Sequence, residues 1–178
     1  MKKFNILIFT SGRSDFDLLL PVIKKIKKNK SIKLKLLVTG SHLSKKHGLT
    51  LSYIRNQNVE ITKTININCE NVNEKNLSNV FSNAQRLYTK FVYNLKEKID
   101  LSIVLGDRFE ALAFASTSFF SNIPLAHIHG GEKTIGAKDD VIRHAITKFS
   151  NLHFVSNKEH QKRVLQLGEN KNNIIICG

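Results

Sequence analysis

Cysteine is scarce in this chain of 178 residues, where only Cys69 and Cys177 occur. They provide neither a disulfide framework nor the paired spacing of a zinc site. No apolar run approaches the roughly 20 residues of a membrane-spanning helix, and Phe4–Phe9, after the basic start, is too short for a signal peptide. The length suits one domain with a buried core. We therefore expect a cytoplasmic globular protein.

Acidic residues are also few: 14 Asp and Glu stand against 28 Lys and Arg, which gives a formal net charge of +14. Many lysines lie between Lys24 and Lys30, with no aromatic residues among them. A platform for single-stranded nucleic acid needs such aromatics, and no recognition-helix motif is present. We expect a solvated lysine-rich surface without a nucleic-acid or membrane partner. A second use of this positive field is to help collect an anionic nucleotide substrate.

The apolar pattern alternates between strand-like runs and helical spacings. The predicted strands are Phe4–Phe9, Ile32–Val38, Val59–Ile67, Leu101–Leu105, Ile123–Ile128, Leu152–Val155 and Ile174–Ile176. The predicted helices are Asp15–Lys28 (beginning or bending near Pro21), Leu49–Asn56, Leu77–Ile99, Phe109–Phe120, Asp140–Phe149 and Lys158–Leu167. This alternation, with no repeat and no linker, predicts a doubly wound, mostly parallel α/β sheet of the Rossmann-like kind, in one domain over residues 1–178.

The three-glycine fingerprint of dinucleotide-binding folds is absent. Instead, Gly12 and Arg13 lie between the first strand and the first helix, whose free N–H groups suit an anion. An ordinary turn with a surface arginine explains the same residues. His42 belongs to the segment Thr39–His42 that closes the second strand. From the pattern alone, a residue that contacts the substrate and a residue without function are equally good interpretations.

The apolar runs that end at Leu105 and Ile128 are followed by glycine and charged residues. Ligands of parallel sheets bind at such carboxyl strand ends, so we expect the loops after Phe9, Val38 and these two strands to meet at one edge. Asp107 follows the Leu105 run. It is predicted as a helix N-cap and, without contradiction, as a carboxylate that contacts sugar hydroxyls or acts as a base.

The next strand end brings two histidines together. His127 and His129 are two residues apart on the predicted strand, so their side chains are expected on one face; Glu132 follows in the next loop. Two histidines on one face favour a ligand site over a packing role. A metal site of these residues is a weaker alternative, and we expect none.

A pair of acids, Asp139 and Asp140, opens a predicted helix that carries Arg143 and His144 on its first turns. One acid is expected to cap the helix and the other to face the crevice.

Taken together, these motifs resemble the N-terminal half of the hydrolysing UDP-N-acetylglucosamine 2-epimerases, in the branch that feeds sialic and legionaminic acid synthesis. The stretches that carry the resemblance are Ser11–Phe16, Val38–Leu43, Gly106–Leu112, His127–Glu132, Asp139–Lys148 and Leu152–Phe154. They occur in the family's order and span most of the chain.

The resemblance implies one half of a glycosyltransferase type B fold, in which two Rossmann-like domains flank the active site. The partner domain, which holds most of the nucleotide site, lies outside this chain. The resemblance implies no cofactor, a nucleotide-sugar substrate, and a homo-oligomer in the full-length form. A domain that binds a sugar nucleotide or a partner without catalysis is the alternative.

The implied reaction begins when a base removes the proton on C2 of the sugar. The nucleoside diphosphate leaves from C1, a glycal forms, and water adds to give free N-acetylmannosamine or a related 2-epimer. By resemblance Asp107, Glu132 and Asp139 are the acid/base and sugar-positioning residues, and Arg13 contacts the phosphates. The other implied substrate-binding residues are His42, His129, Asp140 and Arg143. Some members of the family carry a glutamate where this chain has His129.

Overall fold

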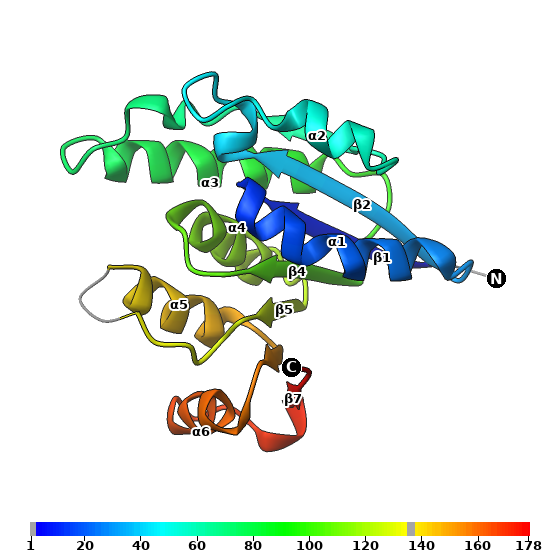
Figure 1. The fold of residues 1–178 in the computed structure, drawn as a ribbon, viewed down its shortest axis with the longest axis vertical. Helices are drawn as coiled ribbons and strands as arrows, with labels where there is room; N and C mark the ends of the chain where they lie inside the picture. Colours follow the sequence, from blue (N-terminus) through cyan, green and yellow to red (C-terminus); the bar gives the residue numbers. More distant parts are fainter. Residues whose placement is uncertain (1–2, 135–137) are drawn as a thin grey trace.

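A computed structural model describes residues 3–134 and 138–178 of the chain. It contains a parallel sheet in the order β3-β2-β1-β4-β5-β6-β7 with helices on both faces (Figure 1). The strands are β1 (Phe4–Thr10), β2 (Ile32–Thr39), β3 (Lys63–Ile65), β4 (Leu101–Leu105), β5 (Leu125–Ile128), β6 (Leu152–Val155) and β7 (Ile174–Ile176). The helices are α1 (Arg13–Lys28), α2 (Leu51–Asn56), α3 (Leu77–Tyr93), α4 (Phe109–Phe120), α5 (Lys138–Phe149) and α6 (Lys158–Gln166). The predicted Rossmann-like α/β class is confirmed.

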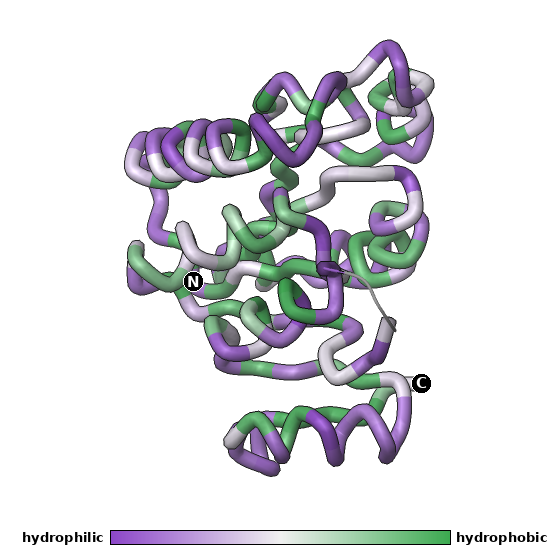
Figure 2. The backbone as a smooth tube through the Cα atoms, turned by 90° about the vertical axis from the view of Figure 1, so that its left-hand side faces the viewer, coloured by the Kyte–Doolittle hydropathy of each residue, from purple (hydrophilic) through white to green (hydrophobic). Residues whose placement is uncertain are grey.

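Alternation along β1 builds a core on each face of the sheet. Leu7 and Phe9 pack toward α3, α4 and α5, whereas Ile6 and Ile8 pack toward α1 and α2. Because a parallel sheet is buried on both faces, its strands read as continuous apolar runs. Most helices by contrast alternate between hydrophilic and hydrophobic residues along their length (Figure 2), whereas α4 is mostly apolar and buried. Among the described residues, no helix is both long and apolar enough to span a membrane.

Most predicted elements agree with the structure, and the differences lie at their ends. α1 begins at Arg13 and runs through Pro21, so the proline does not mark its start. α3 ends at Tyr93 rather than Ile99, because the chain turns there to enter β4. That turn is held by Asn5, whose side-chain amide donates to Lys98 O at 2.9 Å.

Two predicted strands are shorter in the structure. β3 is an edge strand that pairs with β2 only from Lys63 to Ile65, so the apolar residues on either side of it lie outside the sheet. β5 begins at Leu125 instead of Ile123. Asn122 has a positive φ of 54°, and Pro124 has no N–H to donate to a neighbouring strand.

Candidate active site

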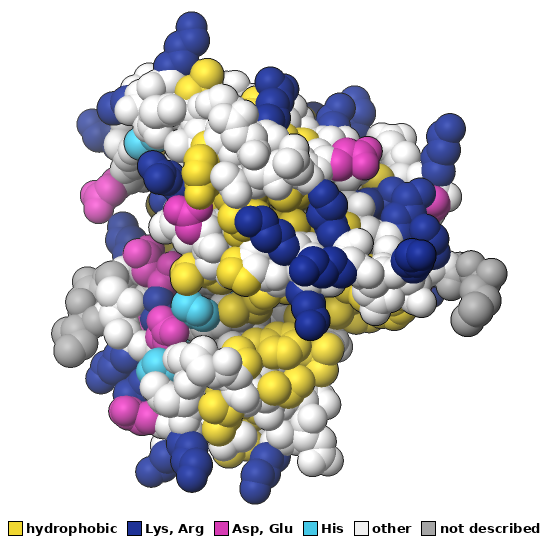
Figure 3. All heavy atoms as spheres, turned by 45° about the vertical axis from the view of Figure 1, so that its right-hand side comes forward, with side chains coloured by type: hydrophobic (Ala, Val, Ile, Leu, Met, Phe, Trp, Pro, Cys, Tyr) yellow, Lys and Arg dark blue, Asp and Glu magenta, His cyan; other side chains and the backbone are white. Residues whose placement is uncertain are grey.

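The carboxyl ends of β1, β2, β4 and β5 lie at one edge of the sheet, because all paired strands run in the same direction. The loops that follow are joined: Ser41 N–H donates to Ser11 O at 2.8 Å, and Gly106 N–H donates to Ile128 O at 3.2 Å. The predicted meeting of these loops is confirmed. Acidic and histidine side chains gather along this edge, at the left of Figure 3. We call these loops the carboxyl edge: residues 11–12, 40–50, 106–108 and 129–134.

A buried acid, Asp15, organises the loop after β1. Its carboxylate accepts from the backbone N–H groups of Ser11 and Gly12 at 3.0 and 2.9 Å, and also from the Thr10 hydroxyl. Asp15 is only 7% exposed, and this burial raises its pKa to about 6 against the opposing effect of the hydrogen bonds. Sequence reasoning missed Asp15. The available signal was its place three residues after Gly12, where a capping acid belongs.

His42 lies beneath the same loop and has no exposed surface. Its Nε2 is 2.9 Å from Thr10 Oγ1, and its Nδ1 is 2.7 Å from Thr50 Oγ1. Burial lowers the pKa of His42 to about 4, so the ring is neutral at neutral pH. Both ring nitrogens already have protein partners, and the side chain supports the loop from below. The predicted contact between His42 and a substrate therefore finds no exposed surface here and stays a prediction.

Arg13, in contrast, stands at the surface as the first residue of α1. Its guanidinium carbon lies 5.0 Å from the centre of the Tyr53 ring, and its Nε is 3.6 Å from an Asp17 carboxylate oxygen. The Tyr53 hydroxyl donates to the same carboxylate at 2.8 Å. An arginine over an aromatic ring is held in place without losing its charge. This geometry keeps Arg13 available to an anion at the carboxyl edge.

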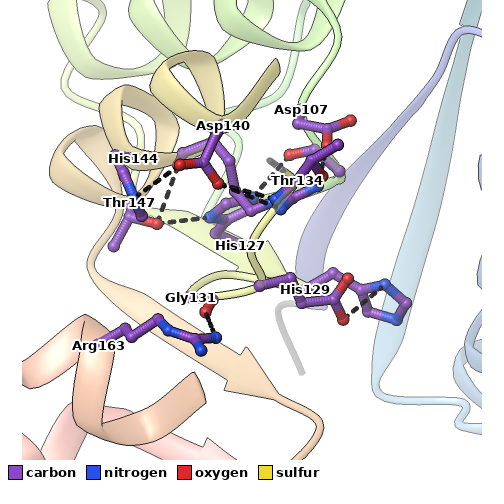
Figure 4. Close-up of polar contacts among 12 residues, drawn as sticks. Asp107, His127, His129, Gly131, Thr134, Asp140, His144, Thr147 and Arg163 are labelled. Carbon is purple, nitrogen blue, oxygen red and sulfur yellow. Dashed lines mark hydrogen bonds and ion pairs between the residues drawn. The ribbon is translucent and has the colours of Figure 1, made fainter. Parts of the chain in front are cut away.

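Asp107 is paired with Arg143, whose Nη2 donates to its carboxylate (Figure 4). The Arg143 side chain is only 7% exposed, and its Nη2 also contacts Thr134 Oγ1 at 3.2 Å. The predicted N-cap role of Asp107 is wrong: the N-cap of α4 is Arg108, with no side-chain capping bond. The Asp107 carboxylate points toward Arg143 on α5 instead.

His127 is fully buried within β5 and joins three elements. Its Nε2 is 2.8 Å from Gly106 O and its Nδ1 is 3.1 Å from Thr147 Oγ1. A carbonyl oxygen only accepts, so the hydrogen of the neutral ring resides on Nε2. Burial lowers the pKa of His127 to about 3. The residue links the end of β4 to α5 and has no exposed surface.

His129 lies beyond the end of β5 and has a positive φ of 68°. This left-handed backbone ends the strand alternation, so the predicted shared face with His127 is wrong. Instead, His129 Nδ1 is 3.3 Å from Glu132 Oε1, and Figure 4 shows the His129 side chain apart from that of His127. The described residues contain no cluster of three potential metal ligands. The alternative metal site of His127, His129 and Glu132 is therefore not formed.

The two acids of α5 differ in their surroundings. Asp140 accepts from Thr134 N–H at 3.1 Å and lies 3.9 Å from Arg143 Nη1 and 3.6 Å from His144 Nε2. Asp139 is exposed. Residues 135–137, which precede this helix in the sequence, lie outside the described residues, so the predicted cap of α5 stays a prediction.

The UDP-N-acetylglucosamine 2-epimerase family model matches residues 24–178 of the chain. This chain belongs to that family. It is 39% identical over its whole length to a hydrolysing GDP/UDP-N,N'-diacetylbacillosamine 2-epimerase of Campylobacter jejuni. It is 36% identical to the polysialic acid biosynthesis protein P7 of Escherichia coli. The chain spans less than half of these relatives, 46% and 44% of their lengths.

Solved structures of the epimerase family share the fold. A crystal structure of UDP-N-acetylglucosamine 2-epimerase superimposes with a TM-score of 0.88 at 19% identity, over 99% of this chain and 48% of that one. The Neisseria meningitidis enzyme bound to UDP-GlcNAc gives 0.84 at 18% identity, over 98% and 46%. A lipopolysaccharide galactosyltransferase gives 0.65 at 11% identity, over 97% and 45%. The last match carries the predicted likeness to the glycosyltransferase type B enzymes.

In this epimerase-family chain the structure groups the predicted site residues unevenly. One cluster contains Asp107, Asp140 and Arg143, and a second contains His129 and Glu132. Arg13 stands apart at the loop after β1.

Proposed function

We propose that this chain is the N-terminal half of a hydrolysing nucleotide-diphospho-N-acetylglucosamine 2-epimerase, which releases a free 2-epimer, such as N-acetylmannosamine, and a nucleoside diphosphate. The observation that carries the proposal is the family membership joined to the acids at the carboxyl edge. Asp107 has 21% and Glu132 30% of its side chain exposed, so a substrate can reach both.

Three acids share the proposed chemistry. One carboxylate takes the C2 proton of the sugar as the C1–oxygen bond to the diphosphate breaks. A glycal results, and water then adds across its double bond with the return of a proton to C2. Asp107, Glu132 and Asp139 are the candidates for these proton transfers. Arg143, held against Asp107, keeps that carboxylate oriented.

The phosphates are proposed to approach the loop after β1. Arg13 supplies a cation there, and the amino end of α1 adds the positive end of its dipole. Asp140 and Arg143 then face the sugar from α5. His42 is left out of the substrate contacts because of its burial.

The relatives direct the choice of substrate. Those from Campylobacter jejuni and Legionella pneumophila are named for N,N'-diacetylbacillosamine carried on GDP/UDP and on UDP, and the Neisseria meningitidis relative for UDP-N-acetylglucosamine. We propose a nucleotide sugar of this group as the substrate of a homo-oligomeric, cytoplasmic enzyme. The low cysteine content supports that location.

The test compares this chain with a longer protein in which it forms the N-terminal half. Both are incubated with each of these nucleotide sugars, and free sugar and nucleoside diphosphate are measured. We expect release by the longer protein and none by the chain, because a partner domain must position the sugar. Absence of release by the longer protein, with intact binding, would instead favour the alternative of a domain that binds without catalysis.

A further inference from the structure

The amino end of α6 packs tightly against the loop that carries Glu132. Gly131 has a positive φ of 76°, and a side chain there would overlap the carbonyl oxygen of His160. Arg163 Nη1 donates to Gly131 O at 3.1 Å (Figure 4). Only glycine permits this approach, and the approach sets the distance between the loop and the helix.

Two side chains extend this contact to the carboxylate. Ser156, at the end of β6, places its Oγ 2.7 Å from His160 Nδ1 and 3.4 Å from Glu132 Oε1. Asn157 caps α6 and accepts from His160 N–H at 2.9 Å, which fixes the backbone of the histidine. The contacts of His129 and Ser156 both fall on Oε1. Among the described residues no polar contact falls on Oε2, which is left for a substrate proton.

The direction of these hydrogen bonds follows from their chemistry. An ionised carboxylate only accepts, so a hydrogen bond between the two side chains uses the one hydrogen of the Ser156 hydroxyl. The same hydroxyl then accepts from His160, whose hydrogen must reside on Nδ1. The other nitrogen of a neutral ring carries no hydrogen.

We propose that Ser156 and His160 are positioning residues, which orient the Glu132 carboxylate through a relay directed from His160 Nδ1–H to the Ser156 hydroxyl and from there to Oε1. This inference rests on the proposed function for its catalytic consequence. Its structural part, the direction of the relay, stands independently of any activity.

The first experiment needs no activity. Long-range proton–nitrogen couplings in this chain, labelled with ¹⁵N and measured about two units above the ordinary imidazole pKa of roughly 6.5, identify the tautomer of His160. We expect the hydrogen on Nδ1 in the wild type and in Ser156→Thr, which keeps the hydroxyl, and its loss from Nδ1 in Ser156→Ala. A wild-type His160 with its hydrogen on Nε2 would overturn the relay.

The second experiment measures steady-state release in the longer protein. Ser156→Ala should lower kcat about tenfold, the scale of a hydrogen bond to a charged group, with KM and melting temperature unchanged. Ser156→Thr should restore kcat, and Ser82→Ala on α3, an exposed serine, serves as control. In a Glu132→Gln background Ser156→Ala should have no further effect, because the residue acts through that carboxylate.

The outcomes separate the two proposals. If the wild type releases nothing, the proposed function fails and the tautomer measurement alone decides the relay. If Glu132→Gln lowers release and Ser156→Ala leaves it unchanged, the positioning role is overturned and the proposed function stands.

Discussion

At the scale of single residues, burial decides what the titratable side chains do. His127 and His42 are both buried and held neutral, and their ring nitrogens hold loops together. Glu132 and Asp107 keep exposed surface at the carboxyl edge. Residue type alone does not separate these roles, because an imidazole can serve as a ligand, a base or a buried hydrogen-bonding group.

The lowered pKa of His127 predicts a pH-dependent stability. The folded-state pKa, about 3, lies below the ordinary value of about 6.5, so the unfolded chain binds a proton first as the pH falls. Stability is then lost from about pH 6.5 downward, by about 2 kcal/mol between pH 7 and pH 5. His127→Gln keeps an N–H for Gly106 O and removes this titration.

Urea unfolding at the two pH values tests the prediction. The loss of unfolding free energy between them should be about 2 kcal/mol smaller in His127→Gln than in the wild type. His42 titrates alike in both proteins and cancels. Equal losses would mean that His127 is protonated in the folded state.

Amide substitutions of the three proposed acids should all lower turnover but should differ in their effect on stability. Changing Asp107, Glu132 or Asp139 to its amide in the longer protein should lower turnover about 100-fold or more if each acts in proton transfer. Asp107→Asn should also lower the melting temperature, because the buried Arg143 loses its charged partner. Asp139→Asn, at an exposed position, should not. Near-normal turnover in all three variants would remove the catalytic assignment.

At the scale of elements, close approach between a loop and a helix places Glu132. α6 reaches the Glu132 loop because Gly131 has no side chain and adopts a positive φ. The sequence pattern predicted α6 within one residue at its end, yet nothing in that pattern indicated that its amino end touches the loop after β5.

Gly131→Ala tests this contact. The substitution adds a methyl group against His160 O and also requires a left-handed alanine, so we expect a loss of at least about 3 kcal/mol in unfolding free energy. Gly168→Ala is the matched control, with a φ of +86° and no atom within 4 Å of the added carbon. It should lose only about 1 kcal/mol, the cost of the backbone conformation. Equal losses would show that the helix yields to the methyl group.

At the scale of the whole molecule, the two faces of the sheet are covered unequally. α1 and α2 cover the β1 and β2 side, and within the described residues no helix lies over β5, β6 and β7 on that face (Figure 1). Phe154 and Leu152 are therefore partly exposed there, and Ile175 is 44% exposed. Parallel sheets are usually buried on both faces, so this exposed apolar surface is expected to lower the solubility of the isolated chain.

Lysine substitutions of two adjacent isoleucines in β7 test this unequal coverage of the two sheet faces. Ile175→Lys should raise the solubility of the chain and change its unfolding free energy by less than about 1 kcal/mol. Ile174, only 6% exposed, packs against α6, and Ile174→Lys should unfold β7 or the chain. Sedimentation and urea unfolding of the two variants check this. Similar destabilisation by both would place Ile175 in a covered position.

The sequence by itself determined the parallel α/β architecture, the strand ends that carry the acids and the family. Periodicity and strand-end glycines are local signals, read from neighbours a few residues apart. Only the tertiary structure decided which acids and histidines face solvent. Thr10, which contacts His42, and Arg143, which orients Asp107, lie 32 and 36 residues away from them in the chain. Local pattern carries no information about such contacts, because packing between distant elements creates the desolvation and the hydrogen bonds that assign each side chain its role.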